Sequence, residues 1–375
     1  MASCIEEFEP ETITFENILV VEATLTDEFG RQEIVLSRTT PIENQANRPE
    51  ENARIAIVEG SQNEFLFEEV APGNYLSLQS FAAIENESYQ LQIETSDGKI
   101  YKSKQENMPS TANIDMLSVS RKVNENGTDG VEISVDGSSD NNETTYFRYE
   151  YEETYQIISP FNPSTDLFVI SENPPLVEER LREKQDRVCY NTTSSNSIMI
   201  ATTQGLIESE ITNFPIRFIA SDDIILRNRY SINVKQFTQT RQAHAFYENL
   251  QEFSDLESVF AQTQAGFIQG NIEALENPNE KVLGYFEVSS VRSQRVFFDF
   301  RDVFPDINFP AFVADCGSDA IEGGFLLNDQ ELVNLLNSGN FRFVTFEFGA
   351  YYLAPAECVD CTLLGTNIEP EFWEE

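Results

Sequence analysis

The side chains best suited to chemistry in this sequence are a single histidine, five cysteines and 64 carboxylates. Any Ser-His-Asp or Cys-His catalytic unit would have to use His244, and no His-rich metal site can form. The sequence contains neither a G-x-S-x-G elbow nor a glycine-rich phosphate loop. A carboxylate pair remains open as catalytic machinery, but among 64 carboxylates proximity in sequence carries almost no information. We therefore predict a protein that is not an enzyme, with no catalytic residue, metal site or cofactor.

The charge balance limits the partners that the chain can bind. Its 375 residues carry 24 Lys and Arg against 64 Asp and Glu, a formal net charge of −40. Such a surface repels nucleic-acid phosphates and anionic lipid head groups, so we expect no nucleic-acid partner. The sequence also lacks the run of about eighteen apolar residues that a spanning helix needs. Contact with a membrane would therefore depend on an anchor.

A candidate anchor lies at the N-terminus, where small residues precede a cysteine in Met1-Ala2-Ser3-Cys4. This arrangement resembles the end of a bacterial lipobox, in which the cysteine is lipidated and held at a membrane by its acyl chains. The acidic run Ile5-Glu6-Glu7-Phe8-Glu9 resembles the export signal of Bacteroidota lipoproteins. We expect residues 1–14 to be a lipidated tether that places the protein on the outer membrane, facing the cell exterior. The alternative is a free or disulfide-bonded Cys4.

The other four cysteines are Cys189, Cys316, Cys358 and Cys361. An even number in an exported protein favours two structural disulfides, for which three connectivities exist. The C-x-x-C spacing of the last two also occurs in redox sites and zinc knuckles. Because so close a pair rarely bonds to itself, we expect each of Cys358 and Cys361 to bond to an upstream cysteine and to fix the C-terminal tail.

Strand patterns dominate the chain. Between Asn17 and Lys104 about seven short apolar or alternating segments are separated by turns, which is typical of an immunoglobulin-like β-sandwich. We therefore predict a mainly β fold with this sandwich at residues 15–110. A larger β-rich domain is predicted at 111–375, after a linker near Met108-Pro109.

Two helices are predicted within the larger domain. Phe246, Leu250, Phe253 and Leu256 recur three or four residues apart, which indicates a helix near 241–262. Residues 327–336 form a second candidate, with Asn328 as its N-cap. The charged segment 174–187 is predicted to be a loop with a short helix.

Several segments have both a functional and a structural interpretation. Gly270-Asn271-Ile272 through Gly284-Tyr285-Phe286 could line a ligand groove, but turns and close packing are favoured. The oxygen-rich loop 136–143 could hold calcium, although a solvated hairpin loop fits its spacing better. The aromatic segment 146–155 could stack on sugars, yet half of its side chains must face a core. We expect Trp373 to pack on its own domain, with a partner-facing anchor as the alternative.

An ordered set of segments resembles the Bacteroidota lipoprotein family catalogued as domain of unknown function 4249. The set comprises Ser3-Cys4 with its acidic follow-on, Gly98-Lys99-Ile100-Tyr101 before Met108-Pro109, Cys189-Tyr190, Phe246-Tyr247-Glu248-Asn249-Leu250, Gly270-Asn271-Ile272, Val282-Leu283-Gly284-Tyr285-Phe286, and Cys358-x-x-Cys361 with Phe372-Trp373. Members of that family look like outer-membrane lipoproteins, often encoded beside TonB-dependent receptors of the SusC type. The resemblance implies an accessory role and supplies no catalytic residues.

These features together predict a surface-exposed outer-membrane lipoprotein that acts as a binding or accessory subunit. The expected partner is an outer-membrane β-barrel, either a TonB-dependent transporter or another large complex, and the membrane is contacted through the lipid anchor alone. Two alternatives stay open: a carboxylate-dependent glycan hydrolase and a surface adhesin or structural subunit.

Overall fold

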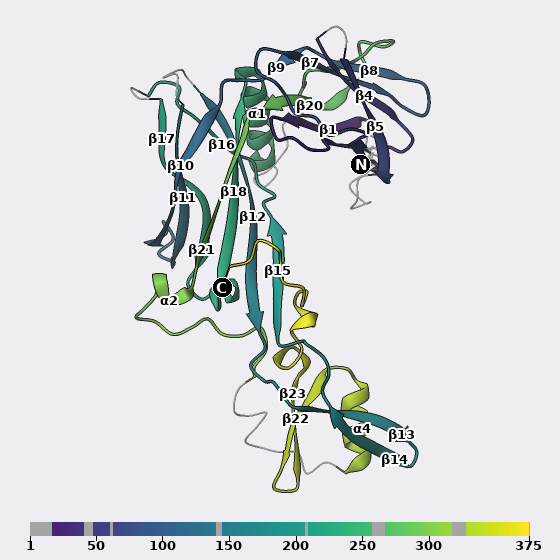
Figure 1. The fold of residues 1–375 in the computed structure, drawn as a ribbon, viewed down its shortest axis with the longest axis vertical. Helices are drawn as coiled ribbons and strands as arrows, with labels where there is room; N and C mark the ends of the chain where they lie inside the picture. The colour runs from purple at the N-terminus through teal and green to yellow at the C-terminus, as the bar shows by residue number, and fades with distance from the viewer. Residues whose placement is uncertain are drawn as a thin grey trace, which may run out of the picture.

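The computed structural model is built almost entirely from β-strands (Figure 1). It describes residues 17–40, 48–60, 63–139, 145–206, 209–256 (backbone only for 254–256), 267–316 and 328–374. The prediction of a mainly β protein with few helices is confirmed. Figure 1 shows an elongated molecule in three parts: an N-terminal module, a central pair of sheets, and a small lobe at the far end of the long axis.

The N-terminal module is an eleven-stranded, nearly closed sheet. Its strands are β1 (Leu19–Thr26), β2 (Glu33–Arg38), β3 (Arg48–Pro49), β4 (Arg54–Glu59), β5 (Asn63–Ala71), β6 (Asn74–Ser77), β7 (Ser88–Glu94), β8 (Ile100–Ser103), β9 (Glu106–Asn107), β19 (Ile272–Ala274) and β20 (Val282–Ser289). In β1 every second residue, from Leu19 to Leu25, is buried in the module's core. That alternation is what a strand with one covered face requires. The module thus draws on residues 272–289 as well as on the predicted range 15–110.

The two end strands of this sheet, β19 and β20, are connected by the side chain of Asn271, which makes the two hydrogen bonds that a neighbouring strand's backbone would make. Asn271 donates from Nδ2 to the carbonyl of Phe286 at 2.9 Å and accepts at Oδ1 from the Phe286 N–H at 2.8 Å. Backbones come so close here that only glycine fits: a Cβ on Gly270 would lie 1.7 Å from the Gly284 carbonyl oxygen. Gly284 has φ +131°, and a Cβ there would lie 2.0 Å from the Val21 carbonyl oxygen. These glycines therefore serve close packing, the structural interpretation that the sequence favoured.

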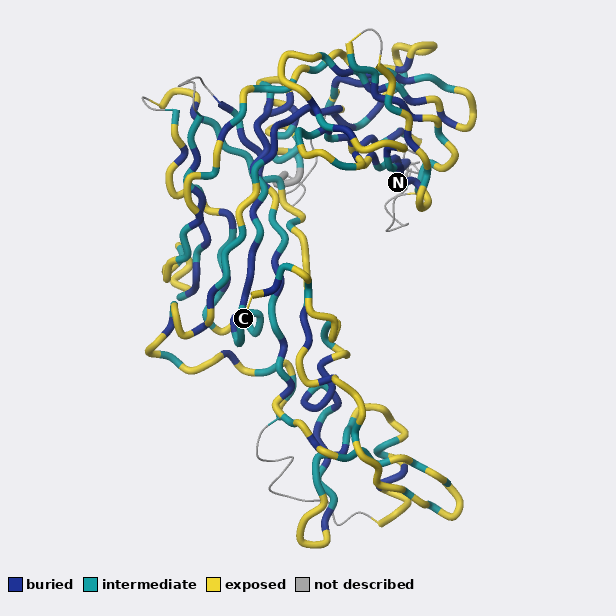
Figure 2. The backbone as a smooth tube through the Cα atoms, viewed as in Figure 1, coloured by how far each residue is buried: buried dark blue, intermediate teal, exposed yellow. Residues whose placement is uncertain are grey.

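The central part is a β-sandwich of two sheets. A three-stranded sheet of β10 (Ala112–Val123), β11 (Asp129–Ser139) and β17 (Glu210–Ala220) covers a five-stranded sheet of β12 (Tyr146–Ile158), β15 (Val188–Ser194), β16 (Met199–Thr202), β18 (Tyr230–Gln239) and β21 (Val291–Phe298). The core between them contains Val131 and Ile133 of β11 against Phe147 and Tyr149 of β12, and Figure 2 shows buried backbone along these strands. Tyr149 is fully buried, so the aromatic segment 146–155 contributes side chains to the core, which is the structural interpretation given in the sequence analysis.

Three short helical segments accompany the central sheets in the described part of the chain. They are η1 (Ile224–Leu226), α1 (Arg241–Leu256) and α2 (Phe300–Val303). The predicted helix near 241–262 corresponds to α1, and its last residues, from 257 onward, lie outside the described residues. Phe246 packs with Tyr285 of β20, ring centroids 5.5 Å apart, so α1 bridges the N-terminal module and the central sheets.

The distal lobe combines two distant stretches of chain. It contains β13 (Thr165–Glu172), β14 (Pro175–Leu181), α4 (Asp329–Asn337), β22 (Phe341–Glu347), β23 (Ala350–Pro355), η2 (Ala356–Cys358) and η3 (Cys361–Leu363). Asn328 caps α4 by accepting from the Glu331 N–H at 3.0 Å, as predicted. The loop with a short helix predicted at 174–187 is wrong, because residues 175–181 are strand β14, paired with β13, and none of the segment is helical. Val177 packs into the lobe's core, which pins the charged strand in place.

Two disulfides connect the C-terminal tail to upstream chain, as the cysteine pattern predicted. Cys189 in β15 bonds to Cys361, and Cys316 bonds to Cys358. After the second bridge the tail returns to the central sheets, where Trp373 packs edge-on against Tyr190 at 4.9 Å. Trp373 is only 8% exposed, so the packing interpretation of this residue is confirmed.

Replacing Gly284 by alanine should lower the free energy of unfolding by about 3 kcal/mol, because it adds backbone strain and a clash with the β1 backbone. Gly98→Ala is a matched control: Gly98 also has positive φ, +85°, but its Cβ would meet nothing within 4 Å. That variant should lose only about 1 kcal/mol. Urea unfolding measures both, and equal losses would contradict the close-packing argument.

The two disulfides should stabilise unequally. Cys189 and Cys361 are 172 residues apart, and Cys316 and Cys358 are 42 residues apart. The loss of chain entropy in the unfolded state sets an upper limit on the stabilisation, of about 5 kcal/mol for the first disulfide and about 4 kcal/mol for the second. The double variant Cys189→Ser/Cys361→Ser should therefore unfold at lower urea concentration than Cys316→Ser/Cys358→Ser. Fluorescence of Trp373, which lies against Tyr190 next to Cys189, follows the transition. If the variant without Cys316–Cys358 unfolds at the lower urea concentration, the disulfide that closes the longer loop is not the more stabilising one.

Candidate functional site

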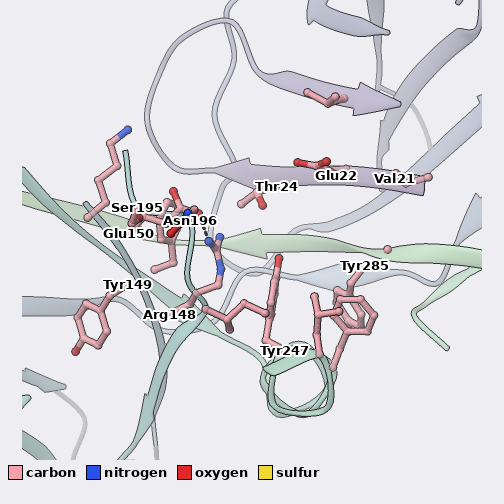
Figure 3. Close-up of a pocket in the computed structure, with 18 of the residues that line it drawn as sticks. Val21, Glu22, Thr24, Arg148, Tyr149, Glu150, Ser195, Asn196, Tyr247 and Tyr285 are labelled. Carbon is pink, nitrogen blue, oxygen red and sulfur yellow. Dashed lines mark hydrogen bonds and ion pairs between the residues drawn. The ribbon is translucent and has the colours of Figure 1, made fainter. Parts of the chain in front are cut away.

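A cleft with a volume of about 730 Å³ lies where the N-terminal module meets the central sheets. Its walls come from β1, β2, β20, β12, β18, α1 and the connection between β15 and β16. This volume and this position between modules are typical of small-molecule sites. Figure 3 shows Arg148, Glu150, Ser195 and Asn196 gathered on one side, with Glu22 and Thr24 on β1 and Tyr247 on α1 around the same space.

Strand alternation determines which β1 side chains reach the cleft. Because Val21 and Ala23 point into the module's core, Glu22 and Thr24 must point out of it. The outer face of β20 contributes in the same way: Tyr285 faces the cleft, while Phe286 belongs to the core. The cleft therefore has a polar wall from β1 and an aromatic wall from β20 and α1.

A buried charge cluster centred on Arg148 of β12 forms the base of the cleft. The Arg148 guanidinium pairs with Glu150 and, at 3.2 Å, with Glu287 of β20. It also lies over the rings of Phe237 at 4.2 Å and Tyr247 at 5.0 Å. Burial would lower the pKa of Arg148, but the carboxylates of Glu287 and Glu150 outweigh it and hold the pKa above its usual value. The arginine therefore stays charged.

Tyr247 belongs to the same cluster. Burial, followed by the charge of Glu287, raises the pKa of its hydroxyl well above the usual value. Ser289 donates to the same carboxylate at 2.7 Å. Because Tyr247 keeps its proton and Glu287 is 1% exposed, neither is placed to exchange a proton with a ligand. The cluster can shape and polarise the cleft, and it favours binding over chemistry.

A second buried group stands behind the aromatic wall. The Tyr285 hydroxyl donates to Glu106 at 2.8 Å, and Asn271 donates to the same carboxylate oxygen at 2.9 Å. Burial is the main cause that raises the pKa of Glu106, and it also raises the pKa of Tyr285. Tyr285 is thus fixed by its hydroxyl, and this wall of the cleft is rigid.

The residues singled out from sequence are placed as follows. Cys4 lies outside the described residues, and so do positions 140–143 of the oxygen-rich loop. His244 is buried on α1 with Nδ1 3.2 Å from Gln239 Oε1, and burial lowers its pKa, which fits a packing residue. Within the described part of the chain no group of His, Cys, Asp and Glu is arranged to hold a metal, and no helix is long and apolar enough to cross a membrane.

Sequence reasoning missed Arg148 and Glu287. Both are charged residues inside strands rich in aromatic and apolar side chains, Tyr-Phe-Arg-Tyr and Gly-Tyr-Phe-Glu-Val. A charge in such a strand indicates a buried pair, because an unpaired charge would not be tolerated there. The sequence therefore indicated that each of these residues has a buried partner of opposite charge, but it did not indicate which residue that partner is.

Glu287→Gln should lower the free energy of unfolding by about 3 kcal/mol, because it removes the buried partner of a buried guanidinium. Glu150→Gln is the matched control, since Glu150 pairs with the same Arg148 but its side chain is 48% exposed. An exposed pair contributes about 1 kcal/mol or less. Thermal unfolding of both variants measures the difference, and equal losses would show that burial of Glu287 is not what matters.

A comparison with family models places much of this architecture in a known family. The model described as Domain of unknown function (DUF4249) matches residues 5–295. The match includes the cleft and both halves of the Arg148–Glu287 pair, and it ends before the cysteine tail. No curated protein matches the chain.

Proposed function

The chain belongs to the DUF4249 family, and on that premise we propose that it is a binding or accessory subunit rather than an enzyme. In this proposal it is an outer-membrane lipoprotein, anchored through Cys4 and facing the cell exterior. It serves a TonB-dependent, SusC-like transporter or another large outer-membrane complex. Its partner is the β-barrel of that complex, and the anchor is its only contact with the membrane.

The observation that carries the proposal is the state of the ionisable groups at the base of the cleft. Arg148 is held by two glutamates, Glu287 is buried, and Tyr247 keeps its proton. A catalytic acid or base needs access to the substrate and a pKa near the working pH. Groups that are locked in this way support a rigid binding surface. The formal net charge of −40 further supports a partner that is neither nucleic acid nor an anionic lipid surface.

Affinity purification of the lipidated protein from its own membrane should recover a β-barrel protein in near-stoichiometric amount. Cys4→Ser should move the chain to the soluble fraction, because the acyl chains are the proposed anchor. Recovery of the lipidated chain alone would contradict the accessory role, and membrane retention of Cys4→Ser would contradict the anchor.

One further result would overturn the proposal in favour of the hydrolase alternative. Glu22, Glu33 and Glu150 all line the cleft, and two carboxyl groups are the machinery of most glycosidases. Glycan turnover that disappears in both Glu22→Gln and Glu150→Gln would assign catalysis to the cleft.

A further inference from the structure

The turn that joins β22 to β23 exposes an aromatic side chain almost completely. Phe348 is 98% exposed and is followed by Gly349. In Figure 1 this hairpin forms the end of the distal lobe, at the opposite end of the long axis from the N-terminal module. None of the side chains in the described part of the chain covers the Phe348 ring.

The backbone of this turn is unfavourable for phenylalanine. Phe348 has φ +52° and Gly349 has φ +82°, so both central residues of a two-residue hairpin are left-handed. Asn, Asp and Gly are the residues usually found at the first position of such a turn, because a larger side chain crowds the backbone. Folding alone therefore favours a small polar residue at 348. The presence of a bulky residue there, in spite of both backbone strain and exposure, points to a contact made outside this chain.

Neighbouring aromatic residues widen the exposed surface. Phe346 is 50% exposed and lies opposite Tyr351 in the strand register, with ring centroids 4.7 Å apart. We call Phe346, Phe348 and Tyr351 the aromatic tip. Behind it, Phe343 and Leu353 are buried against α4, which holds the hairpin in place. The tip is thus a small apolar surface on a fixed support.

We propose that the aromatic tip inserts into an apolar pocket of a partner protein whose rim is basic. This deepens the proposed function and rests on it, since the expected partner is the outer-membrane barrel. The charge of the lobe gives the chemistry of the rim: its two stretches, residues 165–181 and 329–363, contain nine Asp and Glu against two Lys and Arg. Glu347, next to Phe348, is exposed. An acidic surround disfavours insertion into an anionic membrane surface and favours a basic protein rim.

The decisive variant is Phe348→Asn, because asparagine suits the turn. It should leave thermal stability unchanged or raised, yet weaken binding of the purified, co-isolated barrel about tenfold or more, as loss of an aromatic anchor does. Phe29→Asn is the control: Phe29 is 79% exposed on the N-terminal module, and its loss should leave binding unchanged. Glu347→Lys should weaken binding most at low salt, where attraction to the basic rim is least screened.

The outcomes separate the two proposals. If the barrel is recovered and binds wild type and Phe348→Asn equally, the tip proposal is overturned and the accessory role stands. A photo-crosslinking residue at position 348 in intact cells adds a second readout. Crosslinks to the barrel support the proposal, whereas crosslinks only to lipid or to a second copy of this chain overturn it. If no barrel is recovered, the accessory role is overturned. The tip proposal is then overturned as well, unless crosslinking from position 348 identifies another protein. That protein, once purified, must bind Phe348→Asn more weakly than wild type.

Discussion

The parallel pairing of β20 with β1 is the constraint on which the rest of the structure depends. β1 begins the described fold, and β20 reaches it only after the whole central β-sandwich except β21 has been formed along the chain. Immediately after β20, β21 enters the central sheet beside β18. Asp27, just past β1, holds this crossing by accepting from the Val291 N–H at 2.7 Å and from Arg292 at 2.8 Å. One continuous segment therefore belongs to both modules and fixes their relative position, which defines the cleft between them.

The Arg148–Glu287 pair makes that relative position specific. Glu287 is on β20 and Arg148 is on β12, so their ion pair crosses the junction between the modules. A buried pair adds little net stability over an apolar contact, but an unpaired buried charge is costly. Any shift of β20 along β1 would separate the two charges and place a residue with a Cβ at the close approach to Val21 that Gly284 now makes. The charges and the glycine thus select one register and, with it, one shape of cleft.

Local pattern predicted the elements better than their partners. The alternation of β1 and the Asn328 cap of α4 are visible in sequence because both depend on near neighbours. The segment 175–181 misled because Glu178, Glu179 and Arg180 look like a loop, and only Val177 marks the side that β13, β22 and α4 cover. The local sequence of β20 does not predict that this strand pairs with β1. Sequence reasoning suggested only one wall of the cleft, at Gly284 and Tyr285, where a ligand groove was the alternative to close packing. The other walls could not be predicted for the same reason, since the cleft is lined by seven separate parts of the chain.

The distal lobe shows why the cysteines are needed where they are. In the described part of the chain, its buried apolar side chains form two small clusters: Leu332, Phe343 and Leu353, and then Ala354, Cys358 and Val359. So small a core supplies little free energy, and natural modules of this kind rely on covalent links. The two disulfides meet the chain at Cys358 and Cys361, directly after β23, so they hold the base of the hairpin whose tip carries Phe348. A support fixed in this way can keep an aromatic side chain in solvent, because the hairpin cannot fold back to bury it without losing the packing of Phe343 and Leu353 against α4.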